Sequence, residues 1–182
     1  MFLRKKLLII ISSPFTRCIL TEEEFIHALQ QNQNVVHKVC NLYRHTPQGK
    51  EDLFQEIVLN AWKGSKHFKG SALFSTWLYR VALNTAITFL RKEKRQVETF
   101  ALNPQFTLED ESTPLQDEQV NALYKAIGEL SDIEKAVVML YLEDFGYQEM
   151  AGILGITANN VAVKINRIKA KLKEASKKYL SL

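Results

Sequence analysis

The segment YQEMAGILGITANNVAVKINRIKAKL, residues 147–172, has the pattern of two helices joined by a tight turn. Ala151 is small at the point where the two helices must approach each other, and Gly155 can adopt the positive φ that such a turn requires. Thr157 is a favourable N-cap for the second helix. The segment therefore predicts a helix-turn-helix. The apolar stripe of its second helix consists of Val161, Ile165, Ile168 and Leu172.

The opposite side of this second helix is polar and basic, which suits a DNA major groove. Asn can pair bidentately with adenine and Arg or Lys with guanine, and the first turns of such a helix reach the base edges. Residues 158–182 carry seven Lys/Arg and one acid, so phosphates can be neutralised nearby. An ordinary αα-hairpin with a solvated basic face is the alternative, and the charge favours DNA. The candidate readers are Asn159, Asn160, Val163, Lys164, Arg167 and Lys171.

Charge along the rest of the chain is strongly segregated. The 182 residues have a net charge of +4. Residues 63–95 carry eight Lys/Arg and one acid, whereas residues 97–118 carry six acids and no Lys/Arg. Two basic blocks therefore flank one acidic block, which points to a polyanionic partner.

Several classes of protein are disfavoured. Cys18 and Cys40 are the two cysteines and no CxxC pair exists, so we expect no disulfide framework, no metal site and no cofactor. The apolar run Leu7–Ile11 is too short for a signal peptide or a membrane span, and we interpret residues 1–20 as a loose tail or an over-extended gene start. We expect a cytoplasmic protein without membrane insertion, and no enzyme.

The remaining pattern is helical throughout, and we expect an all-α protein of two small domains. A capping box, Thr21 to Glu24, begins the first helix. A break at residues 45–49 precedes a helix that opens near Glu51, and a loop at residues 63–75 precedes a helix to about Arg95. The predicted buried face of the helix that opens near Glu51 consists of Leu53, Phe54, Ile57, Val58, Ala61 and Trp62. A second capping box, Ser131 to Glu134, begins a helix to about residue 143. With few Gly and Pro and no strand pattern, residues 21–96 and 118–182 are the predicted domains.

An acidic linker is predicted between these domains, at residues 97–117. The helical period is lost there, and the stretch contains Pro104, Pro114 and the acids Glu109, Asp110 and Glu111.

Aromatic and cationic residues alternate in KHFKGSALFSTWLYR, residues 66–80. Aromatic rings stack on unpaired bases and cations follow the nucleic-acid backbone, so the stretch predicts a single-strand interface. Phe74 and Trp77 can equally be core residues, and we expect Trp77 to be mostly core.

Two stretches resemble a known family. EDLFQEIVLNAW (51–62) and FSTWLYRVALNTAITFLRK (74–92) resemble region 2 of the extracytoplasmic-function (ECF) sigma factors of the sigma-70 family, and residues 130–174 resemble their region 4. The resemblance implies that core RNA polymerase (clamp helices and flap), promoter DNA and an anti-sigma factor are the partners. It also implies a role for each candidate residue. Asp52, Gln55 and Glu56 would bind the clamp helices; Lys69, Phe74, Trp77, Arg80 and Asn84 the −10 element; and the helix-turn-helix residues named above the −35 element.

The chain departs from the family pattern at two places. Thr88 stands where the family commonly has Asp, and Asn159–Lys164 replaces a Gly-Thr-Val-Lys-Ser-Arg pattern. The second change alters base-reading positions, so the family's −35 preferences do not transfer.

Two other functions remain open. A stand-alone helix-turn-helix regulator would account for residues 130–182 but leaves the 51–62 motif and the aromatic loop without a role. A nuclease or deaminase would need a metal-ligand cluster or paired acids, and neither motif is present.

Overall fold

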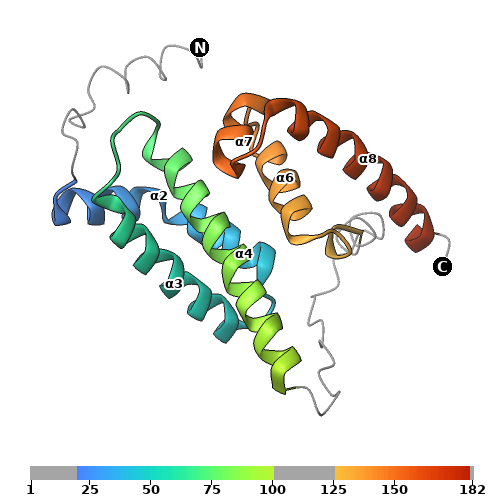
Figure 1. Cartoon of the computed structure of the whole chain (residues 1–182), viewed down its shortest axis with the longest axis horizontal. Coiled ribbons are helices and arrows are strands. Elements are labelled where there is room, and N and C mark those ends of the chain that lie inside the picture. The colour runs from blue at the N-terminus through green and yellow to red at the C-terminus, as the bar shows by residue number, and fades with distance from the viewer. Residues whose placement is uncertain (1–19, 101–125, 181–182) are drawn as a thin grey trace.

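The computed structural model describes residues 20–100 and 126–180, with side chains placed for residues 20–95 and 126–175. All regular structure in these ranges is helical, which confirms the predicted all-α class (Figure 1). A last helical turn at residues 126–128 precedes α6. The helices are α2 (Glu22–Tyr43), α3 (Pro47–Ser65), α4 (Phe74–Phe100), α6 (Asp132–Leu142), α7 (Tyr147–Leu154) and α8 (Ala158–Leu180).

The first bundle, α2–α4, has a core to which all three helices contribute. Helix α2 begins at the predicted capping box, in which the Thr21 side chain accepts from Glu24 N and the Glu24 carboxylate accepts from Thr21 N. Helix α3 has one apolar stripe, and Leu53, Ile57 and Ala61 are each 0% exposed. Because these residues recur every three to four positions, the opposite face of α3 is left at the surface.

Three element boundaries differ from those predicted. Helix α3 begins at Pro47, not near Glu51, because Thr46 caps it by accepting from Gly49 N and Pro47 suits a first helical position. It ends at Ser65, so the following loop is shorter than expected. Helix α4 continues to Phe100, past the expected end near Arg95, because neither Gly nor Pro intervenes before Pro104. The first residues of the predicted linker are therefore helical; those from 101 to 117 lie outside the described residues.

The second bundle, α6–α8, contains the predicted helix-turn-helix. Ser131 and Glu134 form the second capping box, as expected. Gly155 ends α7 with φ +69°, and no atom lies within 4 Å of the position a Cβ would take, so the backbone conformation and not space selects glycine. Residues from all three helices form this core: Val137, Leu140, Met150, Ile153, Val161, Ile165 and Ile168 are buried.

The two bundles lie against each other, with α4 beside α6 and α7 (Figure 1). Tyr43 donates a hydrogen bond of 2.6 Å to the backbone carbonyl of Asp132, and Tyr79 donates one of 3.2 Å to Glu143. Both tyrosines are buried. Sequence periodicity did not predict this contact, because it marks which face of a helix is buried but not which partner covers it.

Truncating Leu53 tests the first core. Leu53→Ala removes a side chain that is 0% exposed, and we expect a loss of about 2–5 kcal/mol in the free energy of unfolding because a cavity forms. The control is Leu59→Ala on the same helix, which is 45% exposed and is expected to change stability by about 0.5 kcal/mol or less. Urea unfolding followed by circular dichroism measures both; equal losses would contradict the burial pattern.

Candidate nucleic-acid and partner interfaces

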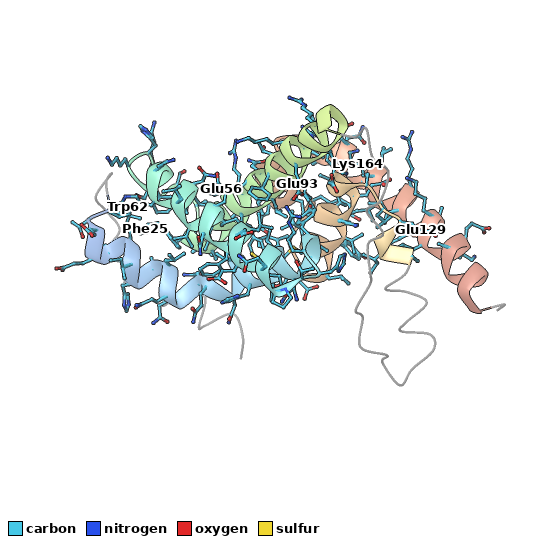
Figure 2. The ribbon with its side chains drawn as sticks, turned by 90° about the horizontal axis from the view of Figure 1, so that it is seen from below. Phe25, Glu56, Trp62, Glu93, Glu129 and Lys164 are labelled. Carbon is cyan, nitrogen blue, oxygen red and sulfur yellow. The ribbon has the colours of Figure 1, made fainter. Side chains whose placement is uncertain are left out.

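Helix α8 presents its first turns to solvent. Thr157 caps it, with its side chain accepting from Asn160 N at 3.2 Å and its carbonyl from Val161 N at 3.0 Å. Asn159, Asn160 and Arg167 are exposed, and Val163 is 40% exposed. Lys164, which Figure 2 labels, is partly buried. These five predicted −35 residues therefore lie on the surface, opposite the stripe that packs in the core.

Lys171, the sixth, has a partner inside the protein. Its ammonium forms an ion pair with Glu134, the carboxylate that also completes the α6 capping box. Lys169 similarly donates to the Tyr141 hydroxyl at 3.2 Å, with its ammonium 4.8 Å from the ring centroid. These lysines tie α8 to α6. Sequence reasoning missed the pairing of Lys171 because its partner is 37 residues away and on another helix.

The ion pair affects the titration of Glu134. The hydrogen bond from Lys171, aided by those from the Ser131 backbone and hydroxyl, lowers the pKa of Glu134 from 4.5 to about 2. Because the carboxylate is charged in the folded protein over a range in which it would be protonated when unfolded, ionised Glu134 stabilises the fold.

This stabilisation is expected to disappear in acid. It is complete above the unfolded pKa and is lost as pH falls from about 4.5 towards 2. The free-energy difference between wild type and Glu134→Gln, measured by urea unfolding at several pH values, should therefore shrink across that range. Glu149→Gln is the matched control, since Glu149 likewise accepts from the N-cap backbone N–H, that of Gly146, and forms no ion pair within the described residues. The same pH dependence in both variants would contradict the assignment.

The outer face of α3 carries three carboxylates whose partners are neutral. Asp52 accepts from Gln48 at 2.9 Å, Glu51 from Gln55 at 3.5 Å and Glu56 from Asn60 at 3.2 Å. Within the described ranges no Lys, Arg or His lies in ion-pair distance of them, whereas Lys38, Arg44, Lys94 and Lys171 pair with acids elsewhere. The predicted clamp-binding residues Asp52, Gln55 and Glu56 therefore share a surface whose negative charge is not neutralised.

Two apolar residues extend this face beyond what was predicted. Leu59 is 45% exposed and Trp62 is 36% exposed, at one and two turns from Gln55. Trp62 was expected on the buried stripe of α3; instead it packs at the rim, edge-on to Phe25 at 5.2 Å between ring centroids (Figure 2). The helical period of α3 places both residues on its surface, and this periodicity is the sequence signal from which they could have been predicted.

The aromatic loop divides its residues between core and surface. Phe74 is 9% exposed and its ring lies 6.2, 5.8 and 5.2 Å from those of Phe25, Phe68 and Trp77. Trp77 is partly buried, in agreement with the expectation that it is mostly core, while Lys69 and Arg80 are exposed. The core role that sequence left open for Phe74 is thus the one seen here.

Two cavities group the predicted −10 residues. One of about 540 Å³ is lined by Lys69, Trp77 and Arg80 on the first bundle and by residues of α7 on the second. The other, about 420 Å³, brings Asn84 together with Glu56 between α3 and α4. The structure therefore joins three predicted −10 residues and places Asn84 beside a predicted clamp-binding residue.

Within residues 20–100 and 126–180, no helix is long and apolar enough to cross a membrane. The same residues contain no group of three or more His, Cys, Asp or Glu positioned to hold a metal ion.

Comparisons with known proteins match this two-part arrangement. The family described as Sigma-70 region 2 matches residues 28–96, and Sigma-70, region 4 matches residues 121–172. The ECF RNA polymerase sigma-E factor of Escherichia coli (strain K12) is 30% identical over 146 residues, which cover 72% of this chain and 76% of that protein. The RNA polymerase sigma-H factor of Pseudomonas aeruginosa is 27% identical over 155 residues, 76% of this chain and 80% of that protein.

Solved structures show the same fold. The sigma factor RpoE of Bartonella quintana, in complex with the anti-sigma factor NepR, has a TM-score of 0.64 at 19% identity, covering 85% of this chain and 98% of that chain. CnrH, in complex with the cytosolic domain of CnrY, has a TM-score of 0.57 at 18% identity, covering 85% of this chain and 88% of that chain.

A region 2 bundle followed by a region 4 helix-turn-helix defines a sigma-70-type protein. Within that class, the chain belongs to the ECF sigma factors, the family of its sigma-E relatives.

Proposed function

We propose that the chain acts in the cytoplasm as an initiation subunit of RNA polymerase, binding the core enzyme and directing it to −10 and −35 promoter elements. The observation that carries the proposal is the presence of both regions, in family order, in one chain. Reconstitution with core polymerase and mapping of transcript starts tests it; start sites that do not depend on the added chain would contradict it.

The outer face of α3 is the proposed site for the polymerase clamp helices. The carboxylates of Asp52 and Glu56 are oriented by neutral amides and keep their charge for a cationic partner. Leu59 and Trp62 add exposed apolar area beside them, the combination of anchor and charged rim that protein interfaces use.

The cavity of about 540 Å³ between the two bundles is the proposed −10 surface. Trp77 supplies an aromatic face, and Lys69 and Arg80 supply cations at its edge. Phe74 packs against Phe25, Phe68 and Trp77, and these core contacts hold Trp77 in position. Asn84 lies about one helical turn beyond Arg80 on α4, and it lines the second cavity, between α3 and α4.

Helix α8 is the proposed −35 reader. Asn159, Asn160, Val163 and Arg167 project from its exposed side, the position from which a recognition helix reaches base edges. Lys164 lies among them, partly buried. Lys171 is committed to Glu134, so its proposed contribution to DNA is to the local positive potential rather than to base reading.

A protein partner of the anti-sigma type is part of the proposal. Both structural neighbours are described in complex with another protein, NepR being named an anti-sigma factor. The stand-alone regulator is not favoured, since it leaves the unneutralised face of α3 without a role.

The linker acids Glu109, Asp110 and Glu111 lie outside the described residues. We propose two alternative roles for them: to hold the linker in a basic channel of the polymerase, or to keep it a solvated tether between the two domains. Replacing all three with Ala at unchanged length should alter core affinity or the yield of abortive transcripts under the first; neither would change under the second.

The α3 face can be tested by charge removal. Asp52→Ala with Glu56→Ala is expected to weaken core polymerase binding by about 2 kcal/mol or more, roughly thirtyfold, because both carboxylates meet a cationic partner. The control pair is Glu22→Ala with Glu23→Ala, which removes the same charge from exposed positions on α2. Affinity is measured by fluorescence titration, with helicity checked by circular dichroism. Equal affinity in the two double variants would count against this face.

The α8 surface can be tested independently of the α3 face. Arg167→Ala should cost about 1–3 kcal/mol on the cognate promoter and relax specificity at one base position. Lys173 lies six residues further along α8. Lys173→Ala should weaken binding to all promoter sequences about equally and lower the salt slope by about 1. Both are measured with reconstituted holoenzyme across promoter variants and salt concentrations. Uniform weakening by Arg167→Ala would remove its base-reading role.

A further inference from the structure

Lys171 continues a row of the proposed −35 residues along α8. Asn160, Lys164, Arg167 and Lys171 recur every three or four residues, so they share one face of the helix. Lys171 stands one turn beyond Arg167 and about 16 Å along the helix axis from Asn160. Because the first turns of a recognition helix meet the base edges, a cation this far along is placed for the DNA backbone instead.

The ammonium of Lys171 is nevertheless turned towards α6, which lies beside α8 (Figure 1). It forms an ion pair with one oxygen of Glu134, Oε1. The other oxygen, Oε2, accepts from the Ser131 backbone N–H at 3.0 Å and from the Ser131 hydroxyl at 2.8 Å. These donors fix the carboxylate, whose side chain is only 16% exposed. Glu134 therefore offers the lysine what a DNA phosphate offers, an anionic oxygen within hydrogen-bond distance.

The pair leaves Lys171 within reach of DNA but gives it a competing partner. Its side chain is 58% exposed, and ion pairs of such exposed groups are weak, so a phosphate can approach the ammonium. The Glu134 carboxyl is ionised at neutral pH, because the hydrogen bond from Lys171 lowers its pKa to about 2. A phosphate that took the lysine would leave this carboxylate charged and unpaired beside the DNA backbone. Lys171 therefore gains little by exchanging one anion for the other.

We infer that Glu134 withholds Lys171 from the DNA backbone, so that α8 binds duplex DNA with one phosphate contact fewer than its row of cations provides. The inference rests on the DNA-binding role proposed for α8. A backbone phosphate carries no sequence information, so Glu134 lowers the affinity for all duplexes alike. Discrimination between sequences is then left to the base-reading residues nearer the start of α8, such as Arg167.

Removing the charge of Glu134 tests this inference. Glu134→Gln keeps a side-chain oxygen that can accept from the Ser131 N–H, so the cap of α6 is retained while the ion pair with Lys171 is lost. The control is Asp144→Asn, which removes the same charge from an exposed residue of the second bundle that forms no ion pair among the described residues. Asn also tolerates the φ of +58° at this position. Circular dichroism and thermal unfolding check that each variant is folded.

Promoter binding by the reconstituted holoenzyme is measured across salt concentrations. One more phosphate contact steepens the salt slope by about 0.9, so the ratio of Glu134→Gln affinity to wild-type affinity should grow about threefold as salt falls from ~200 to ~50 mM. Asp144→Asn should keep the wild-type slope. Adding Lys171→Ala to Glu134→Gln should remove most of the gain, whereas Lys171→Ala alone should change the affinity less.

Three results of this measurement overturn the inference. They are no gain in Glu134→Gln, an equal gain in Asp144→Asn, and a gain that keeps its full size when Lys171 is also replaced. The first would leave the ion pair only its role in holding α8 to α6, and the second would trace the effect to net charge.

Immobilised heparin, a polyanion without base sequence, separates this inference from the proposed function. The free full-length Glu134→Gln chain should elute at higher salt than the Asp144→Asn chain, which has the same net charge. If this order holds while no holoenzyme binds a promoter, the proposed function fails and the withholding of Lys171 from polyanions stands. If the two chains elute together, the withholding is overturned even where promoter binding is intact.

Discussion

The structure depends on burying one stripe of each helix, because every exposed candidate residue takes its position from the stripe behind it. On α3, Leu53, Ile57 and Ala61 are fully buried, and this rotation alone sends Asp52 and Gln55 outward. On α8, Val161, Ile165 and Ile168 play the same part and direct Asn160 and Arg167 to solvent. A shift of one residue in the buried register of either helix would rotate the outer residues of that helix by about 100°, away from their present exposed position.

Charge is organised on this scaffold by the choice of hydrogen-bond partner. Glu134 and Glu143 meet lysines from other helices, and those pairs hold α8 to α6 and one bundle to the other. Within the described part of the chain, Asp52 and Glu56 instead accept from side-chain amides of their own helix. An amide orients a carboxylate without neutralising it, so acids of the same type serve cohesion in one place and remain available to a partner in another.

Sequence reasoning succeeded where the signal was local. The capping boxes at Thr21 and Ser131 and the glycine at the α7–α8 turn were all readable, because their contacts lie within three or four residues. It placed Trp62 too deep and left Phe74 undecided, since an aromatic at helical spacing is compatible with both a core and a rim. The late end of α4 was missed because the continuous apolar stripe that marks the helix ends at Leu90, although the charged residues that follow are good helix formers.

The amino-acid sequence by itself determined the helices, their caps, the buried stripe of each and the family to which the chain belongs, because helical periodicity and capping are properties of neighbouring residues. Only the tertiary structure decided which surfaces meet. The pairing of Lys171 with Glu134, the burial of Tyr43 and Tyr79 against the second bundle and the shared cavity of Arg80 and Glu149 join residues from different helices. Such contacts arise when whole faces dock, and no spacing along the chain records which face will cover which.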